Sequence, residues 1–165
     1  MTETPQIVET APQNIAKISL FVPREEIRNI MGPGIREVFA TVLGQGIAVT
    51  GPWFTYHRRR PNETFDFDIC VPIASPITPA GRVENGVIEA TSVARTIYRG
   101  PYEKLDEGWC ELHAWVKAHG HRSATPLWEA YVVGPESDPN PENWQTELNQ
   151  PLAANPEEEN DVANA

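Results

Sequence analysis

The feature that most constrains the fold of this sequence is an internal repeat marked by turn and strand-end residues. Residues of the first half recur in the second half at nearly constant offsets. The pairs 78 positions apart are Ala16 and Ala94, Pro23 and Pro101, and Glu25 and Glu103, and the pairs 74 positions apart are Gly46 and Gly120, and Pro52 and Pro126. Few other positions match, so the pattern predicts a structural duplication rather than a copied sequence.

Each half shows the same order of predicted elements: strand, helix, strand, strand. In the first half these are a β-branched strand at 15–22, helical patterning over 24–31, an interruption at Gly32-Pro33-Gly34, a second helical piece from Ile35, and strands at 53–58 and 65–73. In the second half they are a strand at 87–99, a helix at 102–118, and strands at 127–133 and 144–148. Glycine and proline mark the turns between them.

The sequence therefore predicts an α+β fold of two duplicated βαββ units related by pseudo-twofold symmetry. We expect a curved antiparallel sheet with the two main helices on one face and a ligand cleft on the other. The expected segments are a flexible N-terminus at 1–12, a domain at 13–152 with units at 13–73 and 87–152 joined by a linker at 74–86, and a disordered acidic tail at 153–165.

The composition restricts the classes of partner. The 165 residues carry a formal net charge of −10 at pH 7. An acidic surface repels the phosphates of nucleic acid, so we expect no direct DNA binding, and we interpret the basic cluster at 57–60 as a solvated turn. No apolar run is long enough to cross a bilayer and residues 1–14 lack a signal-peptide pattern. We therefore expect no membrane association and a cytoplasmic location.

Catalytic thiol and metal signatures are missing from the sequence. Cys70 and Cys110 have neither the spacing of a metal or redox motif nor the flanks of a catalytic thiol, and we expect both to be buried. His113, His119 and His121 do not have the spacing of a zinc motif, and no serine lies in a nucleophile elbow. The sequence thus predicts no metal site and no cofactor.

The strand at 127–133 holds the most informative acidic residue. Side chains alternate along a strand, so Glu129 and Tyr131 share one face while Trp128 lies on the other. Two interpretations stay open: Glu129 is an ordinary acid on a wet sheet face, or it lies on the floor of the cleft. On the cleft floor, burial would raise its pKa and make it a partner for a cationic or hydrogen-bond-donating ligand.

Two further acids occupy matching places on the last strand of each half. Asp68 and Pro72 correspond to Glu147 and Pro151 at an offset of 79. Aromatic residues are dense nearby, and the candidates for the ligand site are Trp53, Tyr56, Tyr98, Trp128 and Tyr131. Rings with a few acids suit flat, lipophilic and cationic molecules, at roughly 0.5 to 2 kcal/mol for each cation–π contact.

Five segments, in this order, resemble the GyrI-like small-molecule-binding family, which includes the effector-binding domains of BmrR-type multidrug-sensing regulators. They are residues 51–56 (GPWFTY), 65–72 (FDFDICVP), 98–103 (YRGPYE), 128–131 (WEAY) and 144–148 (WQTEL). The resemblance covers about residues 15–152. It implies that Glu129 contacts the ligand, that Glu147 is a second acid of the site, and that Tyr56, Tyr98 and Tyr131 line it. The regulators' helix-turn-helix has no counterpart in this sequence.

The resemblance leaves three roles open for a domain without a DNA-binding helix-turn-helix. The first is binding of small lipophilic, aromatic and cationic molecules, by a monomer or a homodimer. The second is hydrolysis of strained cyclopropane rings in DNA-alkylating natural products, with Glu129 as general base and Tyr131 or Tyr98 polarising the leaving oxygen. The third is contact with a protein partner such as DNA gyrase, for which the sequence holds no separate motif.

Overall fold

An eight-stranded antiparallel sheet runs through residues 2–153, the part of the chain that the computed structural model describes. The strand order is β1-β6-β8-β7-β3-β4-β2-β5. The strands are β1 (Gln6–Glu9), β2 (Gln13–Pro23), β3 (Phe54–His57), β4 (Thr64–Pro72), β5 (Glu84–Ile88), β6 (Ser92–Arg99), β7 (Leu127–Val133) and β8 (Gln145–Pro151). Counted outward from the β3–β7 pair, the two halves have matching orders, which is the pseudo-twofold arrangement predicted from the repeat.

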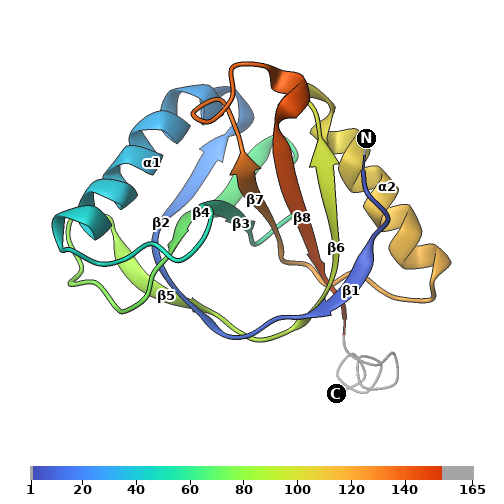
Figure 1. Ribbon diagram of the computed structural model, residues 1–165, viewed down its shortest axis with the longest axis horizontal. Helices are drawn as coiled ribbons and strands as arrows, with labels where there is room; N and C mark the ends of the chain where they lie inside the picture. The colour runs from blue at the N-terminus through green and yellow to red at the C-terminus, as the bar shows by residue number, and fades with distance from the viewer. Residues whose placement is uncertain (1, 154–165) are drawn as a thin grey trace.

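Two helices cover the same face of this sheet. Helix α1 (Ile27–Gly44) packs on β2 and β4, and helix α2 (Leu105–Ala118) packs on β6 and β8. Short 3₁₀ turns at Arg24–Glu26 and Tyr102–Lys104 lead into them, and a third lies at Pro141–Asn143. In Figure 1 the helices stand on opposite sides of the view with β7 and β8 drawn between them. The α+β class, the antiparallel sheet and the shared helix face are thus confirmed.

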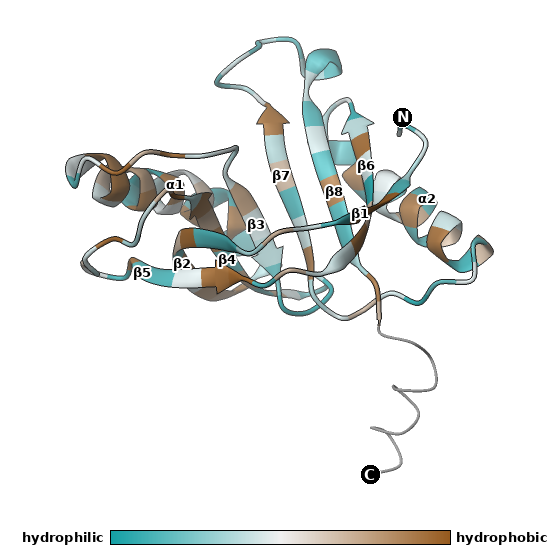
Figure 2. Ribbon diagram, turned by 60° about the horizontal axis from the view of Figure 1, so that its bottom comes forward, coloured by the Kyte–Doolittle hydropathy of each residue, from teal (hydrophilic) through white to brown (hydrophobic). Residues whose placement is uncertain are grey.

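Each helix packs over its own hydrophobic core, and hydrophobic residues recur along both helices (Figure 2). Under α1, Val38 and Val42 contact a cluster that includes Ile18 and Ile69. Under α2, the buried residues are Tyr98, Trp109, Leu112, Val116, Leu127 and Leu148 with Ala94. A smaller cluster on the opposite face includes Ile15, Phe54, Cys70 and Trp128. Cys70 is buried as expected, whereas Cys110 is exposed.

Helix α1 is continuous where the sequence predicts an interruption. Its 18 residues include Pro33, which removes one backbone hydrogen bond from the helix interior. Gly34 lies on the buried side, where an added Cβ would stand 2.7 Å from Cδ1 of Ile69 and 3.1 Å from Cδ1 of Ile18. The glycine therefore permits a close approach of helix to sheet, and this packing keeps the helix intact through the proline.

Two short strands lie where the sequence predicts a flexible end and a linker. β1 falls within 1–12 and pairs with β6, while β5 starts within 74–86 and pairs with β2. Each therefore pairs with the long strand of the opposite half. The turns that follow them also meet, since Thr10 Oγ1 donates to the Thr91 carbonyl and accepts from the Thr91 N–H, both at 3.0 Å. Residues 154–165 of the expected acidic tail lie outside the described residues.

Within residues 2–153, neither helix is long and apolar enough to cross a membrane.

Candidate functional site

Strand register divides the predicted site residues between the two faces of the sheet. Thr55 of β3 pairs with Ile69 of β4 and with Glu129 of β7, and Glu129 pairs with Leu148 of β8. This row lies on the helix face, because Ile69 and Leu148 belong to the cores under α1 and α2. The interpretation that Glu129 lies on the floor of a cleft opposite the helices is therefore wrong.

Neighbouring residues in the same strands form a row on the other face. Asp68, Tyr56, Trp128 and Asn149 are cross-strand neighbours there. Glu147 lies on this face as well, two residues from Asn149 along β8. The predicted set thus separates into Glu129, Tyr131, Trp53 and Tyr98 on the helix side, and Tyr56, Asp68, Trp128 and Glu147 on the opposite side.

Glu129 holds two strong hydrogen bonds. The Trp109 indole Nε1 donates to Oε1 at 2.6 Å, and the Tyr131 hydroxyl donates to Oε2 at 2.7 Å. Burial raises the pKa of Glu129 above its ordinary value, the two donors act in the opposite direction, and Asp106 raises it further. Glu129 keeps partial solvent exposure, and among residues 2–153 no cation pairs with it. It is therefore a carboxylate without a countercharge.

A chain of side-chain hydrogen bonds continues from Tyr131 into the sheet. The Tyr131 hydroxyl and Thr55 Oγ1 are 2.8 Å apart, and Thr55 Oγ1 and His57 Nε2 are 3.0 Å apart. Thr55 and His57 are 2% and 4% exposed. Burial first and the charge of Arg58 second lower the pKa of His57 to about 4, so the imidazole is neutral at physiological pH.

Aromatic rings extend from Glu129 along the surface between the helices. Trp53 stacks on Tyr131 with ring centroids 4.2 Å apart, Tyr102 meets Tyr131 edge to face at 5.9 Å, and Trp144 lies 4.8 Å from Tyr102. All four rings are partly exposed. Burial raises the pKa of Tyr102 to about 12, with help from Glu136 and Glu129, so its phenol stays protonated. Rings beside an uncompensated carboxylate can bind a lipophilic cation.

Tyr98 does not reach this aromatic surface. Its hydroxyl donates to the Pro101 carbonyl at 2.7 Å, its side chain is 2% exposed, and it packs beneath Gly108 of α2. The ring belongs to the core under α2, so the structure does not place it where a ligand-lining or catalytic tyrosine is needed.

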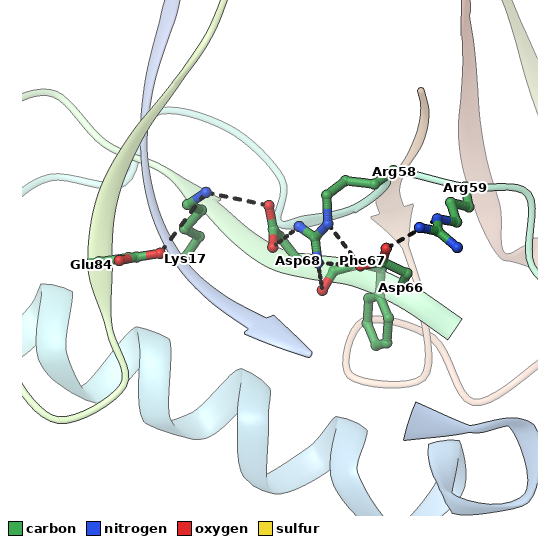
Figure 3. A network of polar contacts seen from close by, with 7 residues as sticks. All are labelled: Lys17, Arg58, Arg59, Asp66, Phe67, Asp68 and Glu84. Carbon is green, nitrogen blue, oxygen red and sulfur yellow. Dashed lines mark hydrogen bonds and ion pairs between the residues drawn. The ribbon is translucent and has the colours of Figure 1, made fainter. Parts of the chain in front are cut away.

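Asp68 is enclosed by cations on the opposite face (Figure 3). Arg58 Nη1 bonds Asp68 Oδ1, and Lys17 Nζ lies 3.5 Å from Oδ2 and 4.0 Å from Glu84. Arg58 also pairs with Asp66 at 2.7 Å. The interpretation of this basic cluster as a solvated turn is therefore wrong for Arg58, which follows β3 and pairs with two carboxylates of β4.

Glu147 is also neutralised. Its Oε1 lies 3.4 Å from Arg95 Nε and accepts a 3.1 Å hydrogen bond from Asn149. Two hollows open on this face, one of about 320 Å³ lined by Lys17, Tyr56, Asp68 and Trp128 among others, and one of about 480 Å³ lined in part by Arg95, Trp128 and Glu147. The face thus has room for a molecule, but the two predicted site acids on it, Asp68 and Glu147, already carry countercharges.

Five functional candidates were not among the site residues predicted from the sequence: Trp109, Thr55, His57, Tyr102 and Trp144. Trp109 carries a helical-face pattern that indicates core packing, which hides its indole N–H. Thr55 and His57 are two positions apart and share one face of β3, but only the pairing of β3 with β7 brings this face to Glu129. Among residues 2–153, no three His, Cys, Asp or Glu side chains are grouped so that they could hold a metal ion.

Several solved structures share this fold. The C-terminal domain of EcmrR matches with a TM-score of 0.81 at 20% identity, over 92% of this chain and 98% of that one. EcmrR in a DNA complex gives the same score and identity, but this chain spans only 58% of its length. A hydrolase from Listeria innocua matches with a TM-score of 0.65 at 13% identity, over 90% of this chain and 91% of the hydrolase. SAV2435 bound to tetraphenylphosphonium matches with a TM-score of 0.65 at 11% identity, over 92% and 95%.

These identities show a common fold and nothing finer. No curated protein matches the chain by sequence. A family model described as the GyrI-like small molecule binding domain matches residues 3–153, which include every strand of the sheet and both helices. The chain therefore belongs to the GyrI-like small-molecule-binding domain family.

Proposed function

We propose that this protein binds small lipophilic organic cations on the helix face of the sheet, against Glu129. One observation carries the proposal: Glu129 is the predicted site acid that keeps partial exposure and has no cation partner among the described residues, while Asp68 and Glu147 are paired. A desolvated carboxylate favours a cationic ligand, because the ligand supplies the missing charge. The rings of Trp53, Tyr102 and Tyr131 offer faces and edges for an apolar body.

The relatives support this choice without deciding it. SAV2435, which shares the fold, is a protein bound to tetraphenylphosphonium, a lipophilic cation with four aromatic rings. EcmrR is a relative that binds DNA as a longer chain. Extending the cation chemistry to this protein rests on Glu129 and its neighbouring rings.

Hydrolysis of strained cyclopropane rings is a second candidate, and the hydrolase relative favours it. Glu129 is suited to orient or deprotonate a water molecule, since its pKa is raised. The tyrosine that would polarise the leaving oxygen is less well placed. Tyr131 already donates its hydroxyl hydrogen to Glu129, and Tyr98 lies in the core. Binding without turnover therefore ranks first. A partner such as gyrase, the oligomeric state and the cytoplasmic location stay predictions.

Calorimetric titration with tetraphenylphosphonium tests the proposal. Glu129→Gln is expected to weaken binding by roughly tenfold to a hundredfold, the range for a hydrogen bond or contact that involves a charged group. Glu147→Gln is the matched control, because it removes an acid from the adjacent strand on the opposite face and should leave the affinity within about twofold.

Two results would overturn the proposal. One is no binding heat for any lipophilic cation at high protein concentration. The other is loss of affinity in Glu147→Gln with none in Glu129→Gln, which would move the site to the hollows on the other face. Release of a ring-opened product from a cyclopropane substrate, abolished in Glu129→Gln, would establish the hydrolase instead.

A further inference from the structure

We propose that His57 and Thr55 are positioning residues that fix the hydroxyl hydrogen of Tyr131 on Glu129 from inside the sheet. This inference rests on the proposed function in one respect: it assigns the chain a role in cation binding. Both side chains are almost fully buried, Thr55 at 2% and His57 at 4% exposure, so neither would contact a ligand directly. Both act through Tyr131, which connects the surface carboxylate to two side chains that are almost fully buried.

The direction of every hydrogen in the chain follows from the carboxylate at its end. An ionised carboxylate only accepts, so Tyr131 must give its single hydrogen to Glu129. The tyrosine oxygen then has to accept from Thr55, whose single hydrogen is used in turn. Thr55 must therefore accept from His57, which requires the hydrogen of the neutral imidazole to be on Nε2.

The second imidazole nitrogen agrees with this assignment. His57 Nδ1 is buried and has no hydrogen-bond partner among residues 2–153. In the assigned tautomer Nδ1 is a bare acceptor, whereas the opposite tautomer would bury an N–H donor without a partner. The stacked ring of Phe67, 5.4 Å away, and the edge of Phe65, 6.1 Å away, fix the plane of the imidazole. The ring is held where its Nε2 meets Thr55.

The hydrogen-bond chain from His57 through Thr55 polarises Tyr131 but carries no proton to the site. Passing a proton toward Glu129 would strip the neutral imidazole of its one N–H and leave an imidazolate, which is unfavourable. Hydrogen bonds in series strengthen one another, so the donor from Thr55 makes Tyr131 a better donor to Glu129. His57 and Thr55 thereby favour the charged form of the carboxylate.

The consequence for a ligand is selectivity. Tyr131 has no hydrogen left for a ligand oxygen, so beside Glu129 the Tyr131 hydroxyl offers a ligand no donor. A molecule that brings a positive charge or a donor is matched, and one that brings only an acceptor, such as a phosphine oxide, is not.

Nitrogen-15 NMR of the histidine side chains tests the assigned direction without any ligand. The signals of His57 are identified because they disappear in His57→Gln. His57 is expected to carry its hydrogen on Nε2. In Glu129→Gln the amide oxygen must face the Trp109 donor, so the amide N–H₂ faces Tyr131 and the chain reverses. The hydrogen of His57 is then expected on Nδ1. An Nδ1–H tautomer in the wild-type protein, or no change in Glu129→Gln, overturns the proposal.

A double-mutant cycle tests the role in binding. Thr55→Val is expected to lower tetraphenylphosphonium affinity by about two- to tenfold, the range for one neutral hydrogen bond, and Thr55→Ser to restore it. In a Tyr131→Phe background, Thr55→Val should change affinity by less than about twofold. The matched control is Thr146→Val. The buried Thr146 hydroxyl makes no hydrogen bond within the described part of the chain, and Thr146 pairs with Tyr131 across the sheet.

An equal loss from Thr55→Val in both backgrounds would show a merely structural effect and overturn the positioning role. If tetraphenylphosphonium does not bind at all, the proposed function fails, while the tautomer measurement still decides whether the chain has the stated direction. Failure of the two ideas is therefore distinguishable.

Discussion

Trp109 of α2 and Glu129 of β7 are joined by a 2.6 Å hydrogen bond from the indole nitrogen to a carboxylate oxygen. The bond connects the helix of the second half directly to the acid at the centre of the sheet. Trp109 packs in the core and is 8% exposed, and its hydrogen bond favours the charged form of the partly exposed Glu129. The charge of Glu129 thus depends on how α2 packs.

Trp109→Phe keeps the apolar ring and removes the donor. Because the donor lowers the pKa of Glu129 against the effect of burial, its loss should raise that pKa further. Cation affinity should then begin to fall at a higher pH as the solution is acidified. Tetraphenylphosphonium titrations between pH 4 and pH 9 measure the shift, and Trp115→Phe on the same helix serves as control. An unshifted profile would contradict the prediction.

Asp68→Asn should reduce stability and leave ligand binding intact. The variant removes the buried carboxylate that Arg58 and Lys17 share, and we expect a loss of about 2 kcal/mol in the free energy of unfolding. Glu84→Gln, at the exposed end of the same network, should cost less than about 0.5 kcal/mol. Urea denaturation measures both. A large loss of cation affinity in Asp68→Asn would instead assign this acid to the ligand site.

His57 should make the protein less stable in mild acid. Its pKa is about 4 in the folded protein and about 6.5 in the unfolded chain. Between these values the unfolded chain binds more protons, so stability falls as the pH drops from 6.5 toward 4, by about 3 kcal/mol in total. The His57→Gln variant cannot titrate and should lose this part of the pH dependence. If the stabilities of the wild-type protein and His57→Gln changed with pH in parallel, the lowered pKa of His57 would be refuted.

Gly108→Ala should destabilise the fold. An added Cβ would lie 2.9 Å from Cδ2 of Tyr98 and 3.4 Å from Cδ1 of Leu148, so helix or sheet must move, at about 1 to 3 kcal/mol. At Gly44, the last residue of α1, an added Cβ would meet no described residue within 4 Å, so Gly44→Ala should be neutral or slightly stabilising. Thermal and urea unfolding compare the two. Equal stabilities would mean that α2 tolerates the displacement.

Residue patterns in the sequence determine much of the fold. The spacing of turn residues predicts the duplication, and strand alternation correctly places Glu129 and Tyr131 on one face and Trp128 on the other. Alternation states which residues share a face, but not which face a helix covers. The predicted side of the sheet for Glu129 was therefore wrong, because only the packing of α1 and α2 decides which face the helices cover.

The split of the predicted site residues has a related cause. Whether Asp68 or Glu147 shares a face with Glu129 depends on register between strands that are distant in sequence. The short strand β1 was missed, and the end of β5 was joined to β6 in the predicted strand at 87–99. Four and five residues of mixed polarity carry little signal of their own. Pairing with β6 and β2 holds them. Pro33 misled in the opposite direction, because close packing at Gly34 outweighs the local cost of a proline.

The exchange of leading strands interlocks the two repeats. β1 comes directly before β2 in sequence yet borders β6, and β5 comes directly before β6 yet borders β2. Cutting the protein into its two repeats would remove a neighbour from each long strand and leave its backbone N–H and C=O groups open to aggregation. We therefore expect neither repeat to fold stably on its own, because β1 and β5, at the two outer edges of the sheet, each pair with the long strand of the other repeat.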